Sequence, residues 1–402
     1  MPDQPFHRPV LYRGGALADG HGAESLLGIS ILVAGGSIRW MGSSDAEPDP
    51  GDATVVDSAG ATFVPGLVDS HSHVTGPGGA NWIARFSDPP ARLGEVAEHN
   101  GRIGLAAGTR WMRDVGSPLG VDPFDGRRRA LALGVRDRWK GRQDRPYLRA
   151  AGSWIFKAGA NPIPEAVAVN DADGLVAAAA GQLDDGADLV KLYMDGPEGD
   201  ASPWTSHEVQ RVVDLARGRG ATVAAHSSRL PGARAAVEGG VDSIEHGFDL
   251  DAELATTMAG RGTTLVSTLA VMRSWLTFGA TTDLERFAGP DGSRTIAQRL
   301  EQAEASVATA YRAGVAIATG TDFGGGSLRA NQLAWEVTSL VAAGLEPADA
   351  LGAATWRGGD LLGEPDAGRI HEGGPADFFL VHGDPLSDPD ALWRVWRTAW
   401  AP

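Results

Sequence analysis

The feature that most constrains the fold of this chain is a strand–helix rhythm that begins after residue 61. Short apolar stretches with polar tips alternate with alanine-rich amphipathic stretches, a pattern that predicts parallel βαβ units and an α/β fold. Eight strands are predicted, at Thr62–Asp69, Thr109–Asp114, Tyr147–Gly152, Leu189–Tyr193, Thr222–His226, Ser243–Glu245, Thr264–Thr268 and Val315–Thr319. Eight such units indicate a (β/α)8 TIM barrel, whose functional residues gather at the carboxyl ends of the strands.

The two ends of the chain differ from this middle part. Residues 1–61 contain short strand-like pieces separated by glycines, and the tail regains β character at Asp377–His382. We therefore expect a small discontinuous β-sandwich domain built from residues 1–61 and 364–402. Residues 62–363 would form the catalytic barrel domain, a division that the length of 402 residues allows.

Charge and composition exclude several classes of function. The chain has 35 basic and 51 acidic residues, a net charge of −16, which argues against nucleic acid or an anionic membrane surface as a partner. It has no cysteine, which excludes disulfides, cysteine-ligated zinc and a thiol nucleophile. No apolar run approaches the roughly 18 residues of a membrane span, and the start lacks the pattern of a signal peptide. We expect a cytoplasmic enzyme that acts on a small molecule.

Two histidines lie at the end of the first predicted strand, in Phe63-Val-Pro-Gly-Leu-Val-Asp-Ser-His71-Ser-His73. Because side chains alternate between the two faces of a strand, His71 and His73 project to the same side. Two imidazoles on one face suit a metal site, although a His-x-His pair also occurs by chance.

Other predicted strands end in residues that could complete such a site. Lys191 lies inside the fourth strand, His226 ends the fifth, His246 follows the sixth and Asp322 follows the eighth. Each has a structural explanation of its own: a lysine that reaches solvent, a core histidine, or an aspartate that bonds its own turn. Together they indicate a metal site, because the tips of parallel strands converge in a barrel.

These motifs resemble those of the amidohydrolase superfamily over nearly the whole chain. The resemblance rests on the stretch around His71, on Gly240-Val-Asp-Ser-Ile-Glu-His-Gly247, on Ala318-Thr-Gly-Thr-Asp322 and on the closing Gly368-Arg-Ile-His-Glu-Gly-Gly-Pro-Ala-Asp. The chain is most similar to the branch that contains Xaa-Pro dipeptidases, carboxypeptidase-like amide hydrolases and imidazolonepropionase-like proteins. The resemblance also implies a homo-oligomer.

The resemblance implies a centre with two divalent metal ions. Imidazole and carboxylate ligands suit zinc best, and manganese, cobalt and iron remain alternatives. Six side chains would serve as ligands: His71, His73 and Asp322 for the buried ion, His226 and His246 for the more exposed ion, and Lys191 between them. Lys191 would bridge the ions as N6-carboxylysine, the carbamate formed with CO2.

The reaction that the resemblance implies is hydrolysis of an amide bond by metal-activated hydroxide, in a dipeptide such as Xaa-Pro or in an N-acyl amino acid. Asp322 would act as general base and then as general acid. Tyr193, two residues past Lys191, is a candidate to contact the substrate and hold the oxyanion. A packed aromatic side chain near the rim explains Tyr193 equally well.

Three further residues are candidates for substrate binding, because they lie in loops that depart from the usual pattern of this branch. Arg229 could bind a substrate carboxylate with two hydrogen bonds, or be a solvated loop arginine. Trp154 adds aromatic surface near the predicted mouth. Asn331 stands near the place where relatives often carry a histidine or an acid.

Other functions remain open from the sequence. One is a mononuclear deaminase or cyclic-amidine hydrolase of the same superfamily, which typically lacks the bridging lysine. The same centre could also hydrolyse an ester, a lactone or a carbamate. A non-catalytic relative is disfavoured because no predicted metal ligand is missing.

Overall fold

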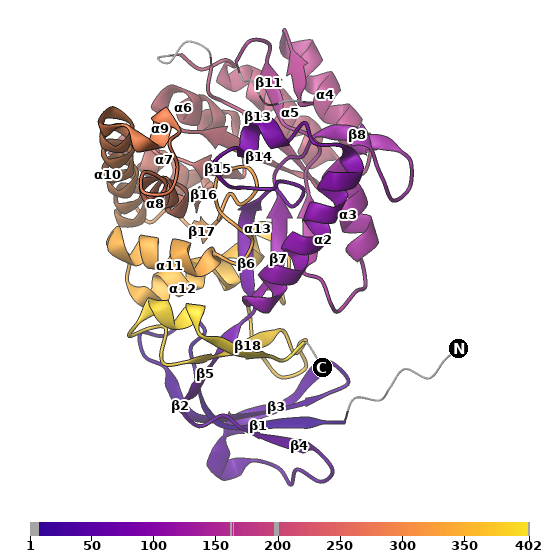
Figure 1. Ribbon diagram of the computed structural model, residues 1–402, viewed down its shortest axis with the longest axis vertical. Helices are drawn as coiled ribbons and strands as arrows, with labels where there is room; N and C mark the ends of the chain where they lie inside the picture. Colours follow the sequence, from indigo (N-terminus) through magenta and orange to yellow (C-terminus); the bar gives the residue numbers. More distant parts are fainter. Residues whose placement is uncertain (1–7, 161–162, 164, 197–200, 401–402) are drawn as a thin grey trace.

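The structure is a computed structural model that describes residues 8–160, 163, 165–196 and 201–400. Its content is mixed α/β, as predicted. In Figure 1, helices surround the central strands in the upper part of the molecule, and a β-rich part forms its lower end.

In the described part of the chain, eight parallel strands of the central part correspond to the eight predicted ones. They are β6 (Leu67–Ser72), β7 (Thr109–Asp114), β10 (Tyr147–Ala150), β13 (Leu189–Tyr193), β14 (Thr222–Ser227), β15 (Ser243–His246), β16 (Thr264–Ser267) and β17 (Ile317–Thr319). Their register places residues predicted for the site side by side: Tyr193 is opposite His226, and Ser227 is opposite His246. The strand predictions are confirmed to within a few residues, with the exception of the first.

The hydrogen-bonded ladder of these strands is not continuous. One sheet has the order β10-β7-β6, and a second runs from β13 to β17 and is extended by β11 (Ile155–Lys157) and β12 (Val167–Val169). Isolated parallel bridges join Ala151 to Leu189 and Ser72 to Phe323, at the two places where the sheets meet. The parallel strands are therefore present, whereas their closure into one barrel stays a prediction.

Helices alternate with the central strands along the chain. They are α1 (Trp82–Arg85), α2 (Pro90–Ala106), α3 (Leu131–Trp139), α4 (Ala172–Asp184), α5 (Ser206–Gly218), α6 (Leu230–Gly239), α7 (Ala252–Arg261), α8 (Leu269–Phe278), α9 (Glu285–Ala288), α10 (Pro290–Arg312), α11 (Leu333–Ala342), α12 (Pro347–Ala353) and α13 (Trp356–Leu362). A short hairpin of β8 (Leu119–Val121) and β9 (Arg128–Ala130) precedes α3.

Helix α5 shows how the local sequence sets these elements. Thr205 and Glu208 form a capping box at its start, which satisfies amide groups that the first turn leaves free. Its buried residues recur at the spacing of one helical face and pack in the main hydrophobic core: Val209, Val212, Val213 and Ala216.

Strands from both ends of the chain pair in one further sheet. They are β1 (Val10–Leu17), β2 (Leu26–Ala34), β3 (Ser37–Ser43), β4 (Thr54–Asp57), β5 (Ala61–Pro65), β18 (Phe378–His382) and β19 (Val395–Thr398). The order is β19-β18-β5-β1-β2-β3, with β4 beside β1. Tyr12, Phe63 and Phe378 pack edge to face in its core. A second layer that would make this sheet a sandwich stays a prediction.

The prediction of one strand at Thr62–Asp69 is wrong. The chain leaves the small sheet at Pro65, where β5 ends, and enters the central sheet at Leu67, where β6 begins. Pro65 has no N–H to continue a ladder, and the Gly66 N–H instead donates to the Asp377 carbonyl at 2.8 Å. A Cβ on Gly66 would lie 2.6 Å from that of Arg110, so only glycine fits at this crossing. The ion pair between Arg110 and Asp377, at 2.7 Å, is buried beside it.

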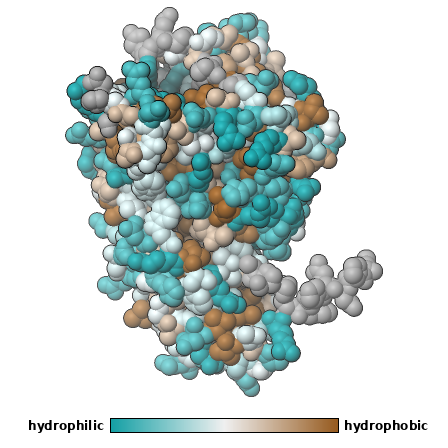
Figure 2. All heavy atoms as spheres, in the orientation of Figure 1, coloured by the Kyte–Doolittle hydropathy of each residue, from teal (hydrophilic) through white to brown (hydrophobic). Residues whose placement is uncertain are grey.

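Figure 2 shows a face with many hydrophilic residues, on which hydrophobic residues form separate patches. One patch lies at the lower end, where Figure 1 places β1–β4. Within the described part of the chain, no helix has both the length and the apolar character needed to cross a membrane.

A fully buried carboxyl group joins two of the helices to a central strand. Glu336 of α11 accepts hydrogen bonds from the Ser267 hydroxyl at 2.6 Å and from the backbone N–H groups of Leu269 and Ala270, which begin α8. Although these three donors lower it, burial raises the pKa of Glu336 from 4.5 to about 7.

This raised pKa predicts a pH dependence of stability. A carboxyl group whose pKa is higher in the folded state stabilises the fold fully below its unfolded pKa, and this contribution is lost as the pH rises through about 7. We expect the unfolding free energy of the wild type, relative to that of Glu336→Gln, to fall by about 3 kcal/mol between pH 4.5 and pH 8. Urea unfolding of both proteins across this range measures the difference. A difference that does not change with pH would contradict the prediction.

Candidate metal centre

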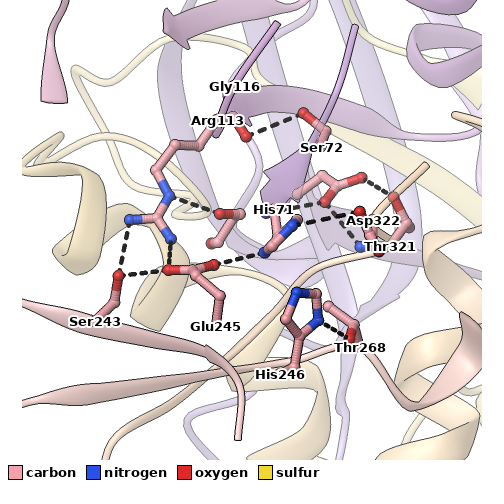
Figure 3. A network of polar contacts seen from close by, with 12 residues as sticks. His71, Ser72, Arg113, Gly116, Ser243, Glu245, His246, Thr268, Thr321 and Asp322 are labelled. Atoms are coloured by element: carbon pink, nitrogen blue, oxygen red, sulfur yellow. Dashed lines mark hydrogen bonds and ion pairs between the residues drawn. The ribbon is translucent and has the colours of Figure 1, made fainter. Parts of the chain in front are cut away.

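Three of the predicted ligands meet at the carboxyl ends of β6 and β17. His71 lies in β6, His73 follows it, and Asp322 follows β17. The Asp322 Oδ1 atom lies 3.4 Å from Nε2 of His71 and 3.1 Å from Nε2 of His73. Both histidines are buried. Figure 3 shows His71 and Asp322 facing each other within a larger polar network.

Two further predicted ligands extend this group along the strand ends. The centre of the His246 ring lies 4.7 Å from the centre of the His71 ring and 4.6 Å from the centre of the His226 ring. Ligand atoms of His71, His246 and Asp322 all lie within 4.8 Å of one another. His226 is the most exposed of the four histidines. Its ring stacks on the Tyr193 ring, with 3.9 Å between the ring centres.

Lys191 is buried in the middle of β13 and is 1 % exposed. Its Nζ atom has no hydrogen-bond partner among the residues that the structure describes. Burial lowers the pKa of Lys191 to about 8, although Glu245 and Asp322 act in the opposite direction. The Lys191 charge in turn lowers the pKa of His71, after the larger effect of burial, which indicates that the amine lies near the imidazoles.

Each of the four imidazoles uses one ring nitrogen in a contact away from the centre. The contacts are His71 Nδ1 with Glu245 at 2.7 Å, His73 Nδ1 with the Gly116 carbonyl at 2.7 Å, His226 Nε2 with Asp195 at 3.1 Å, and His246 Nδ1 with the Thr268 hydroxyl at 2.8 Å. Glu245, Gly116 and Asp195 offer only acceptors here, so the imidazole N–H must donate to each of them. Metal-binding histidines typically hold their second nitrogen in this way.

These contacts leave unshared electron pairs directed at one another. In neutral His71 and His73 the Nδ1 atoms carry the protons, so the Nε2 lone pairs point toward Asp322. Two lone pairs and a carboxylate oxygen repel one another unless positive charge lies between them, either a proton on an imidazole, which the raised pKa of His73 favours, or a metal ion. This geometry fits a bound metal ion.

The electrostatics of the centre follow from burial and from these contacts. Burial and the charges of His226 and His71 hold the pKa of His246 well below its ordinary value, which favours the neutral, metal-binding form. Although burial raises it, hydrogen bonds from His71 and His73 hold the pKa of Asp322 well below the ordinary value. For His73, burial lowers the pKa, but Asp322, Asp114 and the Gly116 carbonyl together raise it above its ordinary value.

The backbone is also unusual at this centre. Three residues other than glycine have positive φ among those described, and two of them are His246, at 72°, and Asp322, at 51°. Such conformations cost energy and recur at functional sites. Gly325 is equally constrained, because a Cβ there would lie 2.0 Å from the His73 ring.

The predicted substrate-binding residues differ in position. Trp154 is buried and its ring centre lies 5.3 Å from that of His73, and Tyr193 stacks on His226 as described. Arg229 is exposed at the start of α6, and Asn331 is exposed just before α11. No contact of the Arg229 or Asn331 side chain with the centre is recorded among the described residues, so the substrate roles of all four stay predictions.

Sequence reasoning missed the residues that hold the imidazoles. Glu245 is completely buried, and Arg113 donates to it at 2.7 Å while also donating to the Ser70 carbonyl. Asp195 and Thr268 were missed as well. Two signals in the sequence could have identified them. Asp195 continues the every-second-residue series of Lys191 and Tyr193, which share one face of β13. Glu245 is an acidic residue inside a short buried strand.

A cavity of about 930 Å³ lies away from this centre. It is lined by Leu189, Thr222 and Thr264, the first residues of β13, β14 and β16, and therefore opens at the amino ends of the strands. Its arginines are paired, for example Arg149 with Glu364. In parallel barrels this end serves stability rather than chemistry.

The chain is similar to known proteins in both sequence and fold. A model of the Amidohydrolase family matches residues 62–398. An uncharacterized protein of Mycobacterium tuberculosis is 29% identical over 370 residues, 88% of each chain. Imidazolonepropionase of Anaeromyxobacter dehalogenans is 27% identical over 388 residues, 89% of this chain and 85% of that protein. A crystal structure of an Xaa-Pro dipeptidase with methionine bound in its active site has a TM-score of 0.82 at 26% identity, covering 96% of this chain and 97% of the other.

Proposed function

The chain belongs to the amidohydrolase family and is a hydrolase acting on carbon–nitrogen bonds, and from this premise we propose that it uses two divalent metal ions, best suited by zinc, to cleave an amide bond in a small molecule. The substrate class is a dipeptide such as Xaa-Pro or an N-acyl amino acid. The similarity to an Xaa-Pro dipeptidase along nearly the full length of both chains supports this class.

One observation carries the proposal: ring nitrogens and a carboxylate oxygen converge with their lone pairs facing one another. His71, His73 and Asp322 would hold the buried ion. His226 and His246 would hold the more exposed ion, in line with the greater exposure of His226. This donor set of nitrogen and oxygen atoms is typical of zinc.

Lys191 would bridge the two ions as its carbamate. The buried Nζ atom without a partner needs one, and the lowered pKa of this amine increases its neutral fraction. A neutral amine adds to CO2 by forming the N–C bond and releasing a proton. The product is an anionic group with two oxygen ligands, whereas an ammonium group would repel both cations.

The residues of the chain would share the steps of hydrolysis. When bound, two cations lower the pKa of a water molecule and polarise the scissile carbonyl. Asp322 takes the proton of the attacking water and passes it to the leaving amine. Tyr193 donates a hydrogen bond to the developing oxyanion from its position against His226. Trp154 forms a wall beside His73.

Two exposed residues would complete the substrate site. Arg229 would bind the substrate carboxylate, and Asn331 would contact the substrate from the loop after Asp322. A mononuclear hydrolase is the second candidate, because the two imidazoles of His71 and His246 and the Asp322 carboxylate could together hold one ion. An ester, lactone or carbamate substrate fits the same centre.

The architecture that we propose around this centre has two parts. The predicted barrel, residues 62–363, forms one (β/α)8 unit from β6 onward, supported by the two parallel bridges between its sheets. Residues 1–61 and 364–402 form the small domain together with residues 62–65, because β5 pairs with β1 and β18 and thus moves the predicted boundary from residue 61 to Pro65. Assembly into a homo-oligomer, which light scattering would test, and a cytoplasmic location belong to the same proposal.

Metal analysis combined with a substrate screen tests the proposed function. Purified protein loaded with zinc in bicarbonate should bind two ions per chain and hydrolyse members of a panel of L- and D-Xaa-Pro dipeptides, other dipeptides and N-acyl amino acids. Active protein with one ion per chain would favour the mononuclear candidate. Active protein without any divalent ion would exclude both.

A further inference from the structure

We propose that Glu245 and Asp195 are positioning residues, one for each of the two metal sites of the proposed function. Each carboxylate accepts the N–H of one imidazole and thereby directs the other ring nitrogen of that imidazole toward its ion. The inference rests on the two-ion centre and adds to it two residues that bind neither metal nor substrate.

Glu245 serves His71, a ligand of the buried ion. Its Oε2 atom lies 2.7 Å from His71 Nδ1, and its Oε1 atom accepts from Arg113 at 2.7 Å and from the Ser243 hydroxyl at 2.5 Å. The Arg113 guanidinium also donates to the Ser70 carbonyl at 2.6 Å, next to His71 in β6. The carboxylate is therefore clamped between β6, β7 and β15, as Figure 3 shows.

Asp195 serves His226, a ligand of the more exposed ion. Its Oδ2 atom lies 3.1 Å from His226 Nε2 and accepts from the Ser228 hydroxyl at 2.5 Å and from the Ser228 N–H at 3.1 Å. Its Oδ1 atom lies 3.2 Å from the same Ser228 N–H, whereas the nearby Ser227 hydroxyl donates to the Arg229 carbonyl at 2.8 Å. The carboxylate thus joins the end of β13 to the loop after β14, and its hydrogen-bonding capacity is taken up by these donors.

The other two imidazoles have neutral partners. His73 donates to the Gly116 carbonyl, and His246 contacts the Thr268 hydroxyl. Each site therefore contains one imidazole supported by a carboxylate and one supported by a neutral group. A carboxylate partner makes the opposite ring nitrogen a stronger ligand, and loss of such a partner typically weakens metal binding about 10- to 100-fold.

The geometry around Glu245 makes the effect of Glu245→Gln specific. Arg113 can only donate, so the new amide must turn its oxygen toward Arg113 and its NH2 group toward His71 Nδ1. His71 would then carry its proton on Nε2, the nitrogen that faces Asp322. The variant should retain the shape of the site but lose the lone pair that binds the metal.

The experiment measures zinc binding to metal-free protein by competition with a chromophoric chelator in bicarbonate buffer. We expect two binding steps for the wild type. Glu245→Gln should weaken one step about 10- to 100-fold and Asp195→Asn the other. The spectrum of the cobalt-substituted protein should change in both variants. Unfolding of the metal-free proteins is followed in parallel, because loss of fold would reduce both steps together.

The matched control is Glu336→Gln, which makes the same change in a fully buried carboxyl group that contacts no predicted ligand. It should leave both steps unchanged. Ser228→Ala, which removes the 2.5 Å hydrogen bond to Asp195, provides a milder second variant if Asp195→Asn does not fold. Ser243→Ala, which removes the hydroxyl that donates to Glu245, is the milder variant if Glu245→Gln does not fold. Each should weaken one step.

The outcomes separate the inference from the proposed function. Binding of a single ion by the wild type would contradict the two-ion function itself. Two wild-type steps that neither carboxylate variant weakens would overturn the inference while leaving the function intact. Equal weakening of both steps in a folded variant would also overturn the assignment of one carboxylate to each site.

Discussion

Replacement of Asp322 with asparagine is expected to lower kcat by about 10²- to 10⁴-fold, the range that general acid–base catalysis contributes. The carboxylate lies 3.1–3.4 Å from two imidazoles, where it can both hold the buried ion and accept a proton. Asparagine has nearly the same shape but cannot accept that proton. KM should change much less than kcat, because the substrate contacts that we propose come from other residues.

Steady-state kinetics and metal content, measured on the same preparation of Asp322→Asn, check this expectation. A variant that binds zinc normally but has lost turnover identifies the proton-transfer role, and one that has also lost an ion identifies the ligand role. Glu336→Gln is the control for removal of a buried acid. Near wild-type turnover in Asp322→Asn would rule out both roles.

Replacement of Lys191 with alanine should lower kcat about 10³-fold, because metal stabilisation of the transition state contributes several kcal/mol and each 1.36 kcal/mol is tenfold in rate. The lysine is 1 % exposed, and its Nζ atom has no hydrogen-bond partner in the described part of the chain. Its removal would leave a small buried space beside β13. Part of the activity should return with added acetate, which supplies two oxygen atoms in that space.

The acetate response distinguishes a missing ligand from a damaged fold. It should saturate with acetate concentration in Lys191→Ala, and acetate should have no such effect on the wild type. Lys191→Arg, which keeps a positive charge but cannot form the carbamate, should be inactive with or without acetate. Normal hydrolysis by Lys191→Ala would favour the mononuclear candidate.

The sequence predicted on which strands the proposed metal ligands lie, because local patterns are sufficient for these strand positions. His71 and His73 share a strand face through simple alternation, and a short apolar run identifies β13 around Lys191. The convergence of their strands follows from the parallel βαβ rhythm. None of these inferences requires knowledge of which side chains touch.

The groups that hold the ligands could not be predicted in the same way. Glu245 meets His71 across 174 positions of sequence and Arg113 across 132, so these contacts depend on the register of strands far apart in the chain. The break between β5 and β6 was missed for the same reason. It depends on the carbonyl of Asp377, which no local pattern around Gly66 reveals.

That break limits how the protein can be taken apart. One residue separates a strand that is held by both ends of the chain from the strand that carries His71. A shortened version that begins at residue 61 would expose the apolar edge of β5 where β1 had paired, and this edge is anchored only six residues from the first imidazole. An engineered exchange of segments with a related protein should therefore transfer the sheet of β1–β5, β18 and β19 together with the central sheets, as one unit.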